Sequence, residues 1–176
     1  LLFHDFGKPE SLTTDENGFD HFKGHAVISE RIASDIIRRL KMDNDTVNTV
    51  RALVRYHDYR PVPEKGAVRR AVNKTGEDIY RMLFPVRIAD TLAQSMYQRQ
   101  EKLEYEGQIQ KIYIEIVNGR ECVSLKDLAV SGNDLIKAGM KPGKEIGDTL
   151  SGLLDMVLED PECNTKEFLL SNLHLS

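Results

Sequence analysis

The chain opens with Leu1-Leu2-Phe3-His4-Asp5-Phe6-Gly7-Lys8-Pro9, an apolar run that ends in a His-Asp pair. Gly tolerates a positive φ and Pro lacks an N–H, so the pattern predicts the end of a buried helix with His4 and Asp5 in its last turn. An imidazole beside a carboxylate is a mixed donor set that suits Zn, Mn, Fe or Ni. The alternative is a surface helix end, where a histidine interacts favourably with the helix dipole.

The same arrangement occurs a second time. Asp43-Asn44-Asp45-Thr46 offers N-cap candidates for a helix that leads to Arg55-Tyr56-His57-Asp58-Tyr59-Arg60. Pro61 and Pro63 then end this helix. Two helix ends that both present His-Asp are harder to explain by the dipole alone. The flanking Arg55 and Arg60 could hold a phosphate, although solvated arginines are the alternative reading.

Two single residues stand out on other predicted helices. His25 comes just before a strong helical pattern over 26–40, at its first turn, where a cap or surface role is the alternative. Asp90 lies within an apolar helical pattern over 79–93. A buried carboxylate there would be costly unless it is paired or binds a metal. Its alternative partner is Arg87 on the same helix.

A short basic segment, residues 65–76, is a candidate for RNA contact. It contains Arg69, Arg70 and Lys74, and the last two are four residues apart and share a helix face. Contacts to phosphate give affinity that does not depend on sequence and weakens with salt. Solvated side chains are the alternative interpretation.

The composition describes a soluble globular protein of one or two small domains. Of the 176 residues, 40% are hydrophobic and 30% charged, and the net charge of −4 argues against a generically basic nucleic-acid coat. Cys122 and Cys163 are too few for a disulfide scaffold or a zinc knuckle, so a reducing, cytoplasmic location is expected. The sequence contains no apolar run of about 18 residues, and no membrane span is expected. A start without Met, inside an apolar run, suggests a fragment of a longer protein.

The second half of the chain is predicted to be helical without obvious chemistry. A long charged helical pattern runs from Gln98 towards Val117 and ends at Asn118-Gly119. Short capped pieces follow, beginning with the capping-box pattern Ser124-Leu125-Lys126-Asp127. We therefore expect an all-α protein with one domain over residues 1–118 and a smaller helical module over 119–176.

The order of His4-Asp5, His25, His57 and Asp90 on successive helices resembles the HD-domain superfamily of metal-dependent phosphohydrolases. Residues 2–9 look like the central motif of that superfamily, and residues 89–93 look like its closing Asp helix. The superfamily's first His precedes the His-Asp pair, and nothing precedes Leu1 here, so an incomplete site is expected. The resemblance implies a divalent metal, namely Mn, Fe, Co, Ni, Zn or Mg. It also implies metal ligands at His4, Asp5, His25, His57 and Asp90, and catalytic roles for Asp5 as a bridging ligand and Lys8 as a phosphate-neutralising cation.

A narrower resemblance covers nearly the whole chain. Residues 128–135 and 142–147 look like the C-terminal, HD-containing part of bacterial tRNA nucleotidyltransferases, the CCA-adding and poly(A)-polymerase group. The sequence contains no Gly-Gly strand motif with a paired Asp-x-Asp, so no nucleotidyl transfer is expected from this chain alone. The resemblance implies tRNA and a nucleotide or phosphoester substrate as partners, support of CCA addition, and phosphoester hydrolysis. The alternatives are a catalytically silent RNA-binding scaffold and a stand-alone nucleotide phosphohydrolase, and the C-terminal motifs argue against the latter.

Overall fold

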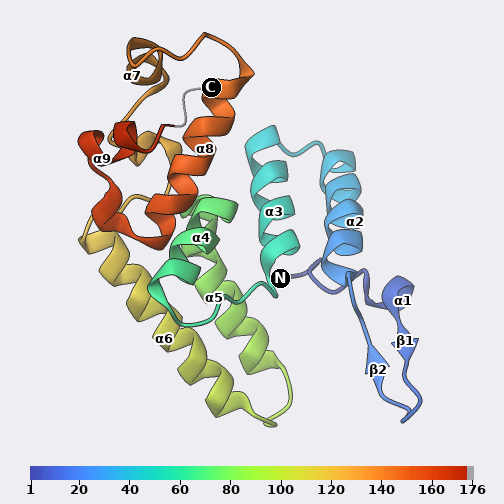
Figure 1. Ribbon diagram of the computed structural model, residues 1–176. Coiled ribbons are helices and arrows are strands. Elements are labelled where there is room, and N and C mark those ends of the chain that lie inside the picture. The colour runs from blue at the N-terminus through green and yellow to red at the C-terminus, as the bar shows by residue number, and fades with distance from the viewer. Residues whose placement is uncertain (174–176) are drawn as a thin grey trace. The chain divides into compact units, whose positions relative to one another are not determined.

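The computed structural model of the protein describes residues 1–173, and apart from one two-stranded hairpin its regular secondary structure is helical (Figure 1). The predicted all-α fold is therefore confirmed. The longer helices are α2 (His25–Arg39), α3 (Asn44–Tyr56), α4 (Lys65–Thr75), α5 (Glu77–Ala93), α6 (Arg99–Asn118) and α8 (Lys144–Glu159). The shorter ones are α1 (Lys8–Ser11), α7 (Gly132–Lys137), α9 (Lys166–Ser171) and the 3₁₀ helices η1 (Leu125–Asp127) and η2 (Pro161–Cys163). Over residues 1–173, every helix is too short or too polar to serve as a membrane-spanning segment.

The opening residues differ from the prediction of a buried helix end. Residues 2–7 form consecutive turns, in which the N–H of His4 donates to the Leu1 carbonyl at 3.1 Å and that of Lys8 to the Asp5 carbonyl at 3.0 Å. Leu1 and Leu2 are exposed rather than buried. Pro9 stands in the first turn of α1, where a missing N–H costs nothing, so this motif begins a helix instead of ending one.

Gly7 is required here for close packing rather than for an unusual backbone angle. Its φ is −83°, which any residue can adopt. A Cβ at this position would lie 2.4 Å from the carbonyl oxygen of His25 and 2.7 Å from the amide nitrogen of Ser29. The N–H of Gly7 also donates to the Ser29 hydroxyl at 2.8 Å. The absence of a side chain therefore lets the opening turns lie directly against α2.

A hairpin and a helix pair follow the opening turns. The strands β1 (Thr13–Thr14) and β2 (Asp20–His21) are antiparallel, with Thr13 opposite His21, in the stretch expected to be rich in turns. The helices α2 and α3 then pack side by side (Figure 1). Their shared core consists of Ala33, Ile37, Val47 and Val54, with Phe3 and Val50 packed against it. The predicted N-cap of α3 is present, because the Asp43 carboxylate accepts the Thr46 N–H at 2.8 Å.

The helix α5 carries two buried charged residues on its inner face. Arg87 is 1% exposed, and its guanidinium forms an ion pair with Glu106 at 3.1 Å and donates to the Tyr59 carbonyl. Asp90 instead lies 3.1 Å from His4 and accepts a hydrogen bond from Gln94 at 2.8 Å. The alternative pairing of Asp90 with Arg87 is therefore wrong, because Arg87 is engaged by Glu106 and Tyr59.

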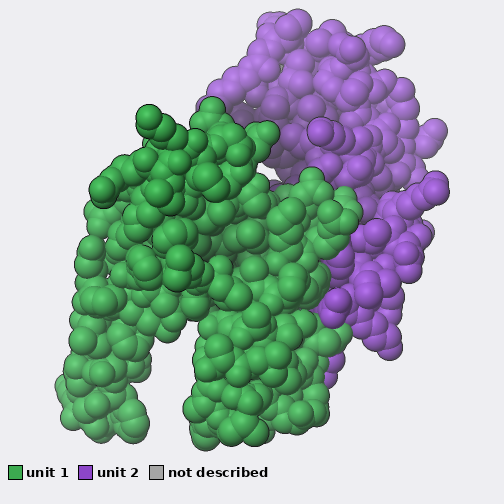
Figure 2. All heavy atoms as spheres, turned by 180° about the vertical axis from the view of Figure 1, so that it is seen from behind, with its two compact units in different colours: residues 1–60, 75–107 green, residues 61–74, 108–176 purple. Residues whose placement is uncertain are grey.

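The chain divides into two compact units, which Figure 2 shows in different colours. The first unit contains residues 1–60 and 75–107, and the second contains residues 61–74 and 108–176. The units therefore interleave in the sequence, whereas the expected domain boundary at residue 118 is a single cut. Residues 61–74, which contain all of α4 except Thr75, are therefore grouped with the C-terminal helices.

The second unit has a core of its own. Its buried members come from α7, α8, α9 and the segment before them: Cys122, Val130, Leu135, Leu153, Leu154, Val157, Leu158 and Leu169. The predicted capping box at Ser124 and Asp127 is present, and a second one joins Ser131 and Asp134. Lys166 also donates to Asp134 at 2.5 Å, so the starts of α7 and α9 are tied together.

Candidate metal centre

All five predicted ligands lie in the first unit, and their side chains converge. His4 and Asp5 come from the opening turns, and His25 is the first residue of α2. His57 follows directly after α3 as its C-cap, and Asp90 comes from the inner face of α5. The start of α2 therefore lies near the end of α3, and Gly7 holds the opening turns against α2. This arrangement brings together residues that are up to 86 positions apart in the sequence.

The ligand atoms form a continuous cluster. Asp5 is at its middle, with carboxylate oxygens 3.3 Å from His4 Nε2, 3.5 Å from His25 Nε2 and 3.8 Å from His57 Nε2. Asp90 Oδ1 adds a further contact to His4 Nε2 at 3.1 Å. His25, His57 and Asp90 are buried, and Asp5 is about one-third exposed, so the cluster is largely shielded but open at Asp5.

Each histidine has its Nδ1 turned towards a backbone carbonyl of its own chain segment. His25 Nδ1 lies 2.9 Å from the Phe22 oxygen and His57 Nδ1 lies 2.8 Å from the Val54 oxygen, and His4 contacts the Leu1 oxygen in the same way. A carbonyl only accepts hydrogen bonds, so Nδ1 carries the proton in each ring. In the neutral rings, the three Nε2 atoms therefore present lone pairs to the cluster.

The distance between His25 and His57 shows whether the cluster can accommodate a cation. Their Nε2 atoms are only 3.2 Å apart, and two lone pairs cannot hydrogen-bond to each other. Protonation of one ring would relieve the conflict, but burial lowers the pKa of His57 and so opposes it. Two nitrogen ligands of one transition metal, each at about 2.0–2.1 Å from the ion, lie at roughly this separation. The donor set therefore fits a divalent transition metal.

Asp58 is a further member of the cluster that the predicted ligand set omits. Its Oδ2 lies 3.3 Å from His25 Nε2 and 3.6 Å from His57 Nε2, and its side chain is half exposed. The groups His4–Asp5–His57 and His25–His57–Asp58 each bring their ligand atoms within 4.8 Å. The sequence carried the signal, because His57-Asp58 repeats the His-Asp pair of residues 4 and 5.

Lys8 lies where a catalytic cation is expected. Its Nζ is 2.6 Å from Asp5 Oδ2. Burial raises the pKa of Asp5, but the Lys8 hydrogen bond and the nearby positive charges outweigh this effect and lower it overall. Beside the cluster is a cavity of about 460 Å³, whose lining includes Lys8, Lys23, His25 and Asp58. A phosphate group in this cavity would meet both the lysines and the candidate ligands.

The predicted arginines of the first unit differ in their relation to the cluster. Arg60 lies 3.5 Å from Asp58 and 3.6 Å from Glu106, so it is a neighbour of a candidate ligand. Arg55 instead lies 3.6 Å from Glu30 of α2, where it belongs to the α2–α3 surface.

The three predicted RNA-contacting residues of the basic segment belong to the second unit. Arg69 is buried and donates to the carbonyls of Leu158 at 2.6 Å and Glu159 at 2.9 Å, and it forms an ion pair with Glu121 at 2.6 Å. This role is structural and leaves Arg69 no free face for RNA. Arg70 forms an ion pair with the Glu159 side chain, and Lys74 is exposed.

Comparison with known proteins identifies the family. Residues 10–173 match the family model described as tRNA nucleotidyltransferase domain 2. The A-adding tRNA nucleotidyltransferase of Deinococcus radiodurans is 25% identical over 158 residues, which cover 88% of this chain and 36% of that protein. The chain thus spans about a third of the length of this relative. The search for similar solved structures found no significant match to the chain. Because the family model covers almost the whole chain, the protein belongs to the tRNA nucleotidyltransferase family.

Proposed function

We propose that the first unit is an HD-type phosphohydrolase centre that binds a divalent metal and hydrolyses a phosphoester of tRNA. The activity would accompany nucleotide addition to the tRNA 3′ end in a longer parent protein. The observation that carries the proposal is the pair of facing Nε2 atoms of His25 and His57, 3.2 Å apart in a buried site. A resident cation resolves this arrangement, whereas a purely structural role leaves the repulsion of two lone pairs unexplained.

The candidate ligands divide into two overlapping sets around this pair. His4, Asp5 and His57 form one set, and His25, His57 and Asp58 form the other, so His57 is common to both. Asp5 also approaches His25 of the second set, at 3.5 Å. Asp90 Oδ1 lies 3.1 Å from His4 Nε2, and both atoms are acceptors when the ring is neutral, so Asp90 would join His4 as a ligand of the same cation. A bound divalent ion supplies Lewis-acid polarisation of a phosphoryl oxygen and lowers the pKa of a bound water.

The residues of the chain have separate tasks in this proposal. Lys8 holds the Asp5 carboxylate in its charged form and can also neutralise a substrate phosphate. Asp58 is half exposed at the cavity, where its carboxylate can accept a proton from an attacking water. The Nδ1 hydrogen bonds of the histidines keep the ligand nitrogens pointed inwards without any help from the ion.

A catalytically silent RNA-binding scaffold is the second candidate. The observation that favours it is the 2.6 Å ion pair between Lys8 and Asp5, which already neutralises the central carboxylate. In that case the cluster would be a charge-balanced polar core, and its residues would contribute to stability without retaining a metal.

Metal retention and hydrolysis separate the two candidates. The chain is loaded with Mn, Co, Ni or Zn, freed of excess ion and analysed for metal content, and then assayed with bis(p-nitrophenyl) phosphate and with tRNA carrying a 3′-terminal phosphate. We expect retained metal and hydrolysis in the parent, and loss of both in His57→Gln and Asp5→Asn. Asp78→Asn is the matched control for Asp5→Asn, because Asp78 is exposed, lies nearest Arg81 and lines neither the cluster nor the adjoining cavity.

Two results would contradict the metal centre. Negligible retained metal in the parent with all four ions would do so, as would equal retention in the parent and His57→Gln. Either result would favour the silent scaffold. Retained metal without any hydrolysis would instead support the metal centre and contradict the phosphohydrolase activity.

A further inference from the structure

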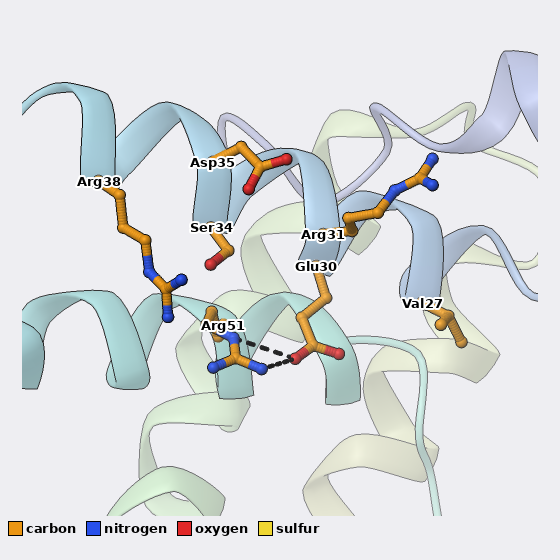
Figure 3. A pocket seen from close by; sticks show the side chains of 7 residues that line it. All are labelled: Val27, Glu30, Arg31, Ser34, Asp35, Arg38 and Arg51. Carbon is orange, nitrogen blue, oxygen red and sulfur yellow. Dashed lines mark hydrogen bonds and ion pairs between the residues drawn. The ribbon is translucent and has the colours of Figure 1, made fainter.

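The groove between α2 and α3 carries a second cluster of polar side chains that contributes nothing to the candidate metal centre (Figure 3). It has a volume of about 290 Å³, and its charged lining consists of Arg31, Arg38, Arg51, Glu30 and Asp35. Ser34 lies among them. All of these residues come from α2 except Arg51, which is on α3.

Arg38 is the cation of this groove whose side chain has no partner. Among residues 1–173, its guanidinium makes no hydrogen bond or ion pair, although it is exposed and carries five N–H donors. Figure 3 shows that it extends from α2 towards α3, on the side where Arg51 also lies. A guanidinium of this kind is suited to a phosphate, which it can bind through two parallel hydrogen bonds.

Ser34 adds a hydroxyl donor to the groove. Its residue is only 7% exposed, yet its hydroxyl makes no hydrogen bond within the described part of the chain. In Figure 3 the Ser34 oxygen points from α2 into the space next to Arg38 and Arg51. The Ser34 oxygen is not among the solvent-inaccessible unpaired atoms of the described chain, so its hydroxyl is accessible in the groove and can donate to a ligand there. Close packing of α2 and α3 accounts for a small side chain at position 34, but an alanine would serve that purpose equally well without a hydroxyl.

Arg51 is held in place by an acidic neighbour. Its Nε and Nη2 donate to Glu30 Oε1 at 3.2 and 2.9 Å, and Arg55 lies 3.6 Å from the other Glu30 oxygen. Glu30 is thus shared by two arginines, and the Nη1 edge of Arg51 makes no hydrogen bond in the described chain. Arg31 pairs outside the groove with Glu10 at 2.9 Å, and Asp35 is the remaining acid. The lining itself carries three arginines and two carboxylates, a formal net charge of +1.

We propose that this groove binds a backbone phosphate of RNA through the Arg38 and Arg51 guanidiniums and the Ser34 hydroxyl. No aromatic side chain lines the groove, so it offers no aromatic platform for a base, and its guanidiniums and hydroxyl are donors suited to phosphate oxygens. An RNA backbone and free phosphate share this chemistry. The choice of RNA rests on the proposed function, in which tRNA is the substrate. The site then gives sequence-independent affinity and holds the tRNA on the first unit.

Binding of tRNA by the chain, measured by fluorescence anisotropy over a range of salt concentrations, tests the proposal. Arg38→Gln is expected to weaken binding about five- to tenfold, as one charge-assisted phosphate contact is lost. It should also reduce the slope of log K against log salt by about one. Ser34→Ala should weaken binding about twofold, because it removes one neutral donor and leaves the helix packing intact. Arg39→Gln is the matched control, because Arg39 is an exposed arginine of the same helix that does not line the groove.

Each outcome decides the matter. Equal losses in Arg38→Gln and Arg39→Gln would show general electrostatic attraction and overturn the site, as would an unchanged affinity in Arg38→Gln. Competition by inorganic phosphate provides the second arm. If Arg38→Gln lowers the affinity for inorganic phosphate but not for tRNA, the groove is an anion site that RNA does not use. Retained metal is unaffected by these variants, so failure here is distinct from failure of the metal centre.

Discussion

Replacing Arg87 with Met should cost the protein a large part of its stability. Arg87 is fully buried beside Glu106, whose side chain is 4% exposed, and their charged atoms are 3.1 Å apart. The guanidinium also donates to the Tyr59 carbonyl and lies 5.6 Å from the centre of the Tyr80 ring. Removing the cation leaves Glu106 as a buried carboxylate whose remaining ionic contact is Arg60 at 3.6 Å.

The expected loss follows from desolvation rather than from the strength of the ion pair. Breaking a buried pair by deleting one partner costs about 3–5 kcal/mol, because the other charge stays buried and poorly compensated. The free energy of unfolding of a typical protein is about 5–15 kcal/mol, so Arg87→Met should lose roughly a fifth or more of the total. The double variant Arg87→Met, Glu106→Leu should recover most of it, since no isolated charge is left behind.

Urea denaturation followed by circular dichroism measures these differences without screening the ion pair. The matched control is Arg81→Met on the same helix, where an exposed arginine lies 3.8 Å from Asp78 and the expected cost is about 0–1 kcal/mol. The reasoning is refuted if Arg87→Met costs no more than Arg81→Met. It is also refuted if the double variant is less stable than Arg87→Met alone.

Two further predictions concern packing and pH. Gly7→Ala should destabilise the protein by about 1–3 kcal/mol, because the new Cβ meets the backbone of His25 and Ser29. The control is Gly107→Ala in α6, where a Cβ has open space and the change should be neutral or stabilising. Thermal unfolding compares the two variants, and equal effects would disprove the packing role of Gly7. Burial raises the pKa of Tyr80 to about 12, despite the opposing charge of Arg87. Because an unfolded tyrosine ionises near about 10, this contribution to stability is present below that pH and is lost as the pH rises towards the folded value. Near-ultraviolet absorbance should show a late ionisation step that disappears in Tyr80→Phe, and a titration that is unchanged by the substitution would refute the assignment.

The helices were predictable because their signals are local. Apolar residues at helical spacing and the N-cap Asp43 place α2 and α3 correctly, and the capping box at Ser124 and Asp127 is where the pattern predicts it. The prediction that the opening motif ends a helix is wrong, because α1 begins there at Lys8. Gly and Pro are compatible with both the end and the start of a helix, and only the contact of Gly7 with α2 shows which applies.

The ligand cluster was predictable in membership but not in detail. A repeated His-Asp pair and an acid in an apolar helix are visible in the sequence, and the structure brings all five residues together. Two details were not predictable: that Asp58 faces the ligand cluster, and that Arg69 is buried rather than available to RNA. Whether a charged side chain faces a ligand, solvent or a carbonyl such as that of Leu158 depends on contacts between segments distant in the sequence. No local pattern records these contacts.

The interleaving of the two units affects how the chain can fold during synthesis. Residues 61–74 leave the ribosome before the rest of the second unit, so Arg69 of α4 lacks its partners Glu121, Leu158 and Glu159 until those residues have been made. His4 likewise waits for Asp90, 86 residues later, before the ligand cluster is complete. Contacts of such sequence separation form slowly. A chain cut at residue 118 would consequently leave the buried Arg69 guanidinium without these three partners, and neither unit can be released by a single cleavage.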